Sequence, residues 1–313
     1  MASLGIVYEE DLVSRIRDLI DGYSKDSILK EYLQNADDSG ATELIVTYDK
    51  RIHKTLDKTD YQHAQGPALL LYNNSKFTES DFESIVKISA QGKSGDANST
   101  GRFGQGFSSS FSISDHPSFI SSNRAYWFDV LKKAVSQNKH ESIQVWKKEG
   151  FHEIGDWLNT FPLPAQNGNR FNGTIFRLPL RNDSTAVESK ISNEIFTHND
   201  FLKWCNEWRS SADSLLFLRH VHRLVLQEID DEGNLVIHLE INTGNAKEIN
   251  NINISLQNEF NGSLLNTCNT WKEHKKNLPL FKYKHEFNIS YFDLETKLHQ
   301  SFQETWSVVS GLF

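Results

Sequence analysis

Two short segments of the chain combine residue types that could bind and activate a phosphate group. The first, residues 29–41, reads LKEYLQNADDSGA and carries Glu31, Asn35 and Asp38. Helical residues advance by about 100° each, so these three side chains point within about 60° of one another and form one polar stripe. A carboxylate can accept a proton from water, and an amide oxygen can coordinate Mg²⁺. By itself the stripe fits a solvated helix face better than a binding site. Asp37 points away from it and is expected to be a solvated or helix-terminal charge.

The second segment, residues 101–107, reads GRFGQGF. Gly101, Gly104 and Gly106 lack Cβ atoms, so backbone N–H groups there can approach a ligand closely. A glycine-rich turn that opens a helix is a natural cradle for phosphate. The pattern is neither the Walker nor the Rossmann fingerprint, and glycines also serve turns and close packing. Taken alone, this segment is weak evidence for a nucleotide site.

Elements that could position both segments follow from the apolar spacing. Helices are expected at 8–20, 26–38 and 198–213, and Thr78 with Asp81 is typical of a capping box that starts another helix. Residues 89–100 are rich in Gly, Ser, Asn and Asp and predict a mobile loop. Strands are expected at 43–49, 68–72, 117–121, 125–131, 142–147 and 173–180, and beyond residue 218 the chain is mostly β, with a hairpin turn at 230–234. This order, without regular βαβ alternation, predicts an α+β sandwich with helices on one face of a mixed sheet.

Composition excludes several classes of protein. The chain has 313 residues, of which 38% are hydrophobic and 24% charged, so a packed core is easily supplied. A net charge of −8 does not support nucleic-acid binding. Only Cys205 and Cys268 are present, which excludes a disulfide framework and fits a reducing, cytoplasmic location. We expect no membrane segment. The scattered histidines, among them His198, form no H-E-x-x-H pattern, so a catalytic metal site is not expected.

Taken together, the order E-x-x-x-N-A-x-D, strand, flexible loop and G-x-x-G-x-G-F resembles the GHKL ATPases, which have the Bergerat fold. Within them it is most similar to the sacsin-type domains, which resemble the ninety-kilodalton heat-shock chaperones. The resemblance covers residues 8–181 and continues less clearly through SLLFLRHV (214–221). It is carried by LQNADDSGAT (33–42), GPALLLYN (66–73), FTESDFESI (77–85), GRFGQGF (101–107) and GTIFRLPLR (173–181). It implies a two-layer α/β sandwich with a mostly antiparallel sheet and a β-rich C-terminal part. It also implies a chaperone-type module that binds ATP with Mg²⁺ and hydrolyses it slowly, under a lid formed by 89–100.

The resemblance assigns a role to each matching position. Glu31 would act as the general base and Arg102 as a partner of the γ-phosphate, while Asn35 would supply the protein ligand to Mg²⁺. The remaining nucleotide-binding positions would be Asp38, Asn73, Phe77, Lys93, Ser94, Gly101, Gly104, Gln105, Gly106, Phe107 and Thr174.

One position departs from the family pattern. Relatives usually carry an Asp-x-Gly turn after the central strand, whose carboxylate accepts the adenine amino hydrogens, but Asn73 stands at that place. An amide oxygen can still accept this hydrogen bond, although it is uncharged. Phe77 could equally be a core aromatic, and Thr174 a strand threonine. The alternative function is therefore a degenerate Bergerat domain, serving as a non-hydrolysing nucleotide-sensing or protein-interaction scaffold. The retained Glu31 favours an ATP hydrolase.

The expected organisation has two parts. Residues 1–230 would form the ATP-binding domain, and 231–313 a β-rich extension or the start of a following domain. Expected partners are ATP and ADP, protein clients or a coupled C-terminal domain, and a second copy through dimerisation of a longer natural chain.

Overall fold

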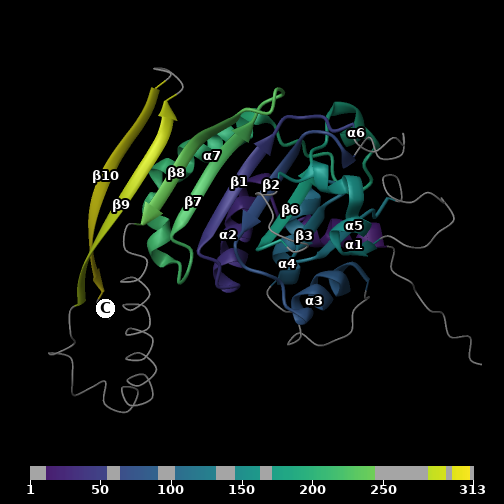
Figure 1. Ribbon diagram of the computed structural model, residues 1–313, viewed down its shortest axis with the longest axis horizontal. Coiled ribbons are helices and arrows are strands. Elements are labelled where there is room, and N and C mark those ends of the chain that lie inside the picture. The colour runs from purple at the N-terminus through teal and green to yellow at the C-terminus, as the bar shows by residue number, and fades with distance from the viewer. Residues whose placement is uncertain are drawn as a thin grey trace, which may run out of the picture.

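A computed structural model describes residues 12–54, 64–90, 103–131, 145–162, 171–243, 281–293 and 298–310. Within them, ten strands form one sheet in the order β10-β9-β8-β7-β1-β2-β6-β3-β4-β5 (Figure 1). Neighbouring strands are antiparallel except β1 and β7, which are parallel. The strands are β1 (Glu43–Asp49), β2 (Ala68–Asn73), β3 (Ser118–Ser121), β4 (Arg124–Phe128), β5 (Val145–Glu149), β6 (Thr174–Pro179), β7 (Arg223–Ile229), β8 (Leu235–Thr243), β9 (Phe281–Asp293) and β10 (Leu298–Ser310).

Helices α1 and α2 precede β1, and the other helices lie between strands along the chain. The α-helices are α1 (Leu12–Ile20), α2 (Ile28–Asp38), α3 (Glu79–Ala90), α4 (Phe103–Ser108), α5 (Phe151–Ile154), α6 (Asp183–Glu188) and α7 (His198–Ser210). Short 3₁₀ turns are η1 (Lys25–Ser27), η3 (Ser109–Ser112), η4 (Gly155–Thr160) and η5 (Ala212–Phe217). Among the described residues, no helix is long and apolar enough to cross a bilayer.

The mixed α/β architecture with a mostly antiparallel sheet is confirmed, and local signals explain its element boundaries. Gly40 has φ +75°, the left-handed conformation that ends α2. Before α3, the Thr78 backbone N–H donates to Asp81 Oδ2 at 2.8 Å and the Thr78 hydroxyl accepts from the Asp81 N–H at 3.3 Å, as a capping box requires. The hairpin between β7 and β8 turns at Gly233, which has φ +90°. Strands β8, β9 and β10 continue the same sheet, and the division of the chain at residue 230 stays a prediction.

Both faces of the sheet are covered at β3, β4 and β6, which differs from the expectation of helices on one face. Phe119 and Phe176 belong to the main core with α1, α2 and α7, whereas the adjacent Ile120 and Ile175 belong to a second cluster with α5 and η4. Successive residues of a strand point to opposite faces, so the two clusters lie on opposite sides. The strands β3, β4 and β6 carry apolar side chains on both faces. The longer helices cover one of these faces, and α5 with η4 covers the other.

A buried ionic group lies at the C-terminal end of β1. Asp49 is fully buried, and its carboxylate accepts hydrogen bonds from Arg51 Nε at 2.8 Å and Arg51 Nη2 at 3.0 Å, with His53 Nε2 at 3.3 Å. Burial alone would raise the pKa of Asp49, but the hydrogen bonds with His53 and Arg51 outweigh it and lower the pKa to about 2. The ionised carboxylate is therefore the form that the fold stabilises.

We predict that Asp49→Asn destabilises the fold by about 2 kcal/mol near neutral pH, because a lowered folded-state pKa contributes stability above the unfolded-state pKa. That contribution is complete above the ordinary value of 3.8 and is lost as the pH falls through the folded value of about 2. Urea denaturation of both proteins from about pH 3 to about pH 7 measures it. Asp231→Asn, in the exposed hairpin turn, is the control. A difference that grows as the pH falls would contradict the prediction.

Candidate functional site

Helix α2 carries the polar stripe at the edge of the core. Leu29, Leu33 and Ala36 are buried, whereas Glu31, Asn35 and Asp38 are half-buried. Between these two sides, the Tyr32 hydroxyl lies 2.7 Å from Ser110 Oγ, which links α2 to η3 after the glycine-rich segment. The helix thus has an apolar side in the core and a polar side that is partly open to solvent.

The stripe and the glycine-rich segment meet at Asn35 and Gly106. A Cβ atom built on Gly106 would lie only 2.4 Å from Asn35 Nδ2, which is closer than real Cβ contacts allow. The Asn35 amide therefore lies directly against the backbone of α4, in space that any other residue at position 106 would fill. Two motifs separated by about 70 residues in the sequence are neighbours in the fold.

The turn after β2 brings together two more of the predicted residues. Asn73 and Thr174 are paired between β2 and β6, and both are buried. Asn73 Oδ1 accepts the Ser75 backbone N–H at 3.0 Å. The Thr174 hydroxyl donates to the Ser75 carbonyl at 2.8 Å and lies 2.8 Å from Ser121 Oγ. Both polar groups are thus partly used in holding the turn, so a ligand would reach them only through the donor and acceptor sites that remain.

Further hydrogen bonds fasten this turn to the end of α2. Ser75 Oγ donates to the Ser39 carbonyl at 2.8 Å. Asn74 Oδ1 accepts the Thr42 backbone N–H at 2.9 Å, and Asn74 Nδ2 donates to Thr42 Oγ1 at 2.7 Å. The end of the helix that carries the polar stripe and the turn that carries Asn73 are therefore held side by side.

Aromatic residues form the core beneath these segments. Phe107 is buried, with ring centroids 4.8 Å from Phe128 and 6.0 Å from Phe176. Phe77 is half-buried and lies 5.2 Å from Phe119 and 5.4 Å from Phe82. Phe107 can therefore serve a ligand only through its backbone, and Phe77 acts at least as a core aromatic.

The acidic residues at the end of α2 differ from expectation. Asp37 is buried rather than solvated, and its carboxylate accepts the backbone N–H groups of Arg219 at 3.0 Å, His220 at 2.6 Å and Val221 at 3.1 Å. Its next neighbour, Asp38, pairs with Arg219 Nη2. The sequence did not show these contacts, because their donors lie about 180 residues away.

The remaining predicted site residues are Glu31 and those in or just before the glycine-rich segment. Burial, and then the charge of Glu31, raise the pKa of the hydroxyl of Tyr23, which lies between α1 and η1. The predicted phosphate contacts Lys93, Ser94, Gly101 and Arg102 lie outside the described residues. Gly104 and Gln105 lie within α4, of which only the backbone is described at these positions. Their roles, like those of Glu31, Asn35 and Asp38, stay predictions.

Sequence reasoning missed a second polar cluster, formed by His198, Glu228 and His238. Glu228 Oε2 lies 2.5 Å from His198 Nε2 and 3.1 Å from His238 Nε2. Burial would raise the pKa of Glu228, but hydrogen bonds with Lys50 and His198 outweigh it and lower the pKa. Burial also lowers the pKa of His238. No motif spacing could have indicated the cluster, since its members come from three separate elements.

Comparison with known proteins places the chain in a family. The sacsin domain family matches residues 9–239. The chain belongs to the sacsin domain family. Human sacsin is 36% identical over 234 residues, which cover 71% of this chain but only 5% of the human protein. The chain therefore spans about one twentieth of that relative's length. Among solved structures, the N-terminal domain of a DNA repair protein is 12% identical with a TM-score of 0.40, covering 74% of this chain and 57% of that one. This similarity is too weak to carry an argument about function.

The contact between Asn35 and Gly106 in this sacsin domain can be tested by a double-mutant cycle. We predict that Gly106→Ala destabilises the wild-type protein by about 1–2 kcal/mol, because the new Cβ must displace the Asn35 amide. In an Asn35→Ala background the same change should be neutral or stabilising, since Ala is favoured over Gly within a helix by about 1 kcal/mol. Urea denaturation of the four proteins measures both effects. Equal effects in the two backgrounds would show that the residues do not interact.

Proposed function

We propose that this sacsin domain is an ATP-binding module of the GHKL type, with the Bergerat fold, and that it hydrolyses ATP slowly with Mg²⁺. The observation that carries the proposal is the contact of Asn35 with Gly106. It joins the E-x-x-x-N helix to the glycine-rich segment, which are the two parts of the chain that chemistry alone suggests for phosphate binding. Two further observations support the proposal: the chain belongs to the sacsin domain family, and the same motifs resemble those of the ninety-kilodalton heat-shock chaperones.

The residues present fit a magnesium-nucleotide complex. Asn35 offers a half-buried amide oxygen, and Mg²⁺ takes oxygen ligands while keeping several waters, so one protein ligand beside the phosphates is sufficient. Gly106 has no side chain, so the Asn35 amide lies directly against the backbone of α4. When bound, Mg²⁺ would neutralise charge on the phosphate oxygens.

The chain's own groups would then position the attacking water. Glu31 precedes Asn35 by about one helical turn on the same polar stripe. Its half-buried carboxylate would orient a water and accept its proton. Asp38 forms an ion pair with Arg219 and would line the nucleoside side of the pocket. Partners, whether protein clients, a coupled C-terminal domain or a second copy, would use the energy of this cycle in a chaperone-type protein.

The alternative is a degenerate domain that serves as a nucleotide-sensing or interaction scaffold without hydrolysis. One observation favours it. Asn73 replaces a carboxylate, and both Asn73 and Thr174 spend hydrogen-bonding capacity on Ser75. Adenine would then be held weakly, because a neutral acceptor that is already engaged contributes less than a free charged one.

We predict saturable binding of Mg-ATP by the wild-type chain in a calorimetric titration. Asn35→Ala should abolish binding at the same concentrations, because it removes the magnesium ligand. The matched control is Gln34→Ala, which alters the neighbouring exposed position of the same helix and should bind as the wild type. Circular dichroism confirms that each variant is folded. No binding by the folded wild type at millimolar Mg-ATP would contradict the proposal.

A second measurement separates the ATPase from the scaffold. We predict that Glu31→Gln retains Mg-ATP binding while phosphate release falls by about 100-fold or more, the usual contribution of a general base. A steady-state phosphate-release assay on the wild type, Glu31→Gln and Lys30→Gln tests this, because Lys30 is the exposed neighbour on the same helix. Binding without measurable wild-type turnover would favour the scaffold.

A further inference from the structure

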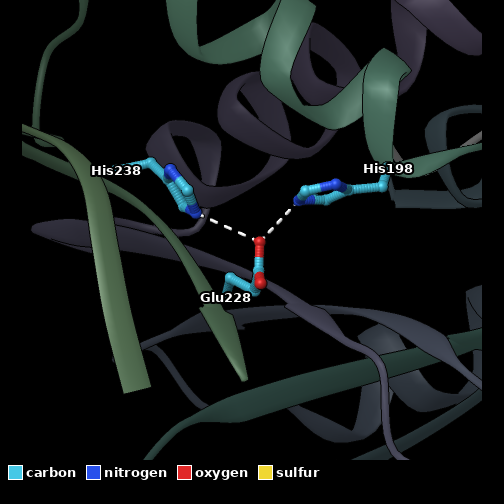
Figure 2. Close-up of side chains that lie close together, drawn as sticks. All are labelled: His198, Glu228 and His238. Atoms are coloured by element: carbon cyan, nitrogen blue, oxygen red, sulfur yellow. Dashed lines mark hydrogen bonds and ion pairs between the residues drawn. The ribbon is translucent and has the colours of Figure 1, made fainter. Parts of the chain in front are cut away.

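Two imidazoles converge on one carboxylate oxygen near the C-terminal end of β7, outside the proposed nucleotide site. Figure 2 shows His198 and His238 approaching Glu228 from different elements, with each ring directed at the same oxygen. One ligand atom from each residue lies within 4.8 Å of the other two. Glu228 and His238 are buried and His198 is half-buried.

A β-bulge brings His238 into this cluster. The pairing of β7 with β8 passes from Leu226–Leu239 to Gln227–Ile237, which leaves His238 as the extra residue. In a regular strand, His238 and Leu239 would point to opposite faces, and Leu239 belongs to the main core. With the extra residue, His238 is buried on the side of Glu228 and α7. Bulges commonly redirect a side chain in this way beside functional sites.

The third member is placed by the start of α7. His198 is its first residue, and a capping box between Thr197 and Asp200 determines where the helix begins, with the Thr197 N–H 2.7 Å from Asp200 Oδ2. Asp200 in turn pairs with Lys25 Nζ at 3.0 Å, which attaches this helix start to η1. The position of the His198 backbone is therefore determined by contacts independent of the cluster.

The second carboxylate oxygen is already engaged. Lys50 Nζ lies 2.5 Å from Glu228 Oε1, so only Oε2 faces the two imidazoles. This contact keeps the carboxylate ionised and makes it a single-oxygen ligand, as outer partners of ligating carboxylates do. The ammonium charge also repels a nearby cation, so the expected affinity is moderate.

The surroundings suit a bound ion that reaches the protein from solvent. Aromatic rings enclose the imidazoles: Tyr48 lies 5.3 Å from His198, and Phe201 lies 5.7 Å from His238. Each histidine also lines a cavity, of about 430 Å³ for His238 and about 690 Å³ for His198. The cluster thus lies among aromatic rings, and two of its three members each line a cavity.

We propose that His198 Nε2, Glu228 Oε2 and His238 Nε2 bind a divalent transition-metal ion of the Zn²⁺ class. Two imidazoles and one carboxylate form a ligand set that Zn²⁺ accepts, with the fourth position left to water. Metal–ligand distances of about 2.1 Å place tetrahedral ligand atoms about 3.4 Å apart. The nitrogen–oxygen separations of 2.5 and 3.1 Å therefore need to widen by less than about 1 Å. Hard Mg²⁺ prefers oxygen ligands, so this site and the nucleotide site should select different metals.

Titration of the tag-free chain with Zn²⁺, without nucleotide or Mg²⁺, tests the proposal. We expect one ion per chain by calorimetry, and Co²⁺ used as a substitute should give the visible absorption of a four-coordinate ion. His198→Gln and His238→Gln should each weaken binding at least tenfold, because each removes one of three ligands. His152→Gln, at an exposed position of α5, is the matched control and should bind as the wild type.

His238→Gln could disturb the bulge, so His198→Gln at the start of α7 provides the second, independent variant. Circular dichroism and urea denaturation confirm folding of each protein. Asn35→Ala should bind Zn²⁺ as the wild type does, which separates this proposal from the nucleotide site. No Zn²⁺ binding by the folded wild type, or equal affinity in the two ligand variants and the wild type, would show that the cluster is only a hydrogen-bonded ion pair.

Discussion

The buried carboxylate of Asp37 holds the end of α2 against the segment that leads into β7. A buried charge without hydrogen-bond donors destabilises a protein by several kcal/mol, and here three consecutive backbone N–H groups, from residues 219–221, supply the donors. The chain leaves α2 into β1 and leaves residue 221 into β7, which is the parallel neighbour of β1. One side chain therefore aligns the helix with the only parallel strand pair among the described strands.

This anchoring determines which way the polar stripe of α2 faces. With Asp37 directed at residues 219–221 and Leu33 in the core, Asn35 is left facing α4 and Asp38 faces Arg219. The same strand β7 then runs to the second cluster, where Glu228 meets two histidines. The beginning of β7 thus supports the proposed nucleotide site and its end carries the proposed metal site, so displacement of this strand would affect both.

Much of the local structure could be predicted from the chain itself. The strand at 43–49, the helix ending near Asp38 and the Thr78–Asp81 capping box follow from apolar periodicity and capping chemistry, which act over a few residues. The motif order also indicated the sacsin-type family, to which the chain belongs. The covering of the second sheet face by α5 and η4 was not anticipated, because an apolar strand does not reveal which element will cover it.

The sequence by itself determined the longer helices, most of the strands and the two motifs suited to phosphate chemistry, because these depend on residue type and short spacing. Only the tertiary structure decided the contact of Asn35 with Gly106, the burial of Asp37 and the engagement of Asn73 with its own turn. It alone also placed His198, Glu228 and His238 together. These outcomes depend on strand register and on a one-residue bulge. Shifting a strand by one residue reverses every side chain on it, and no local pattern around His238 records that shift.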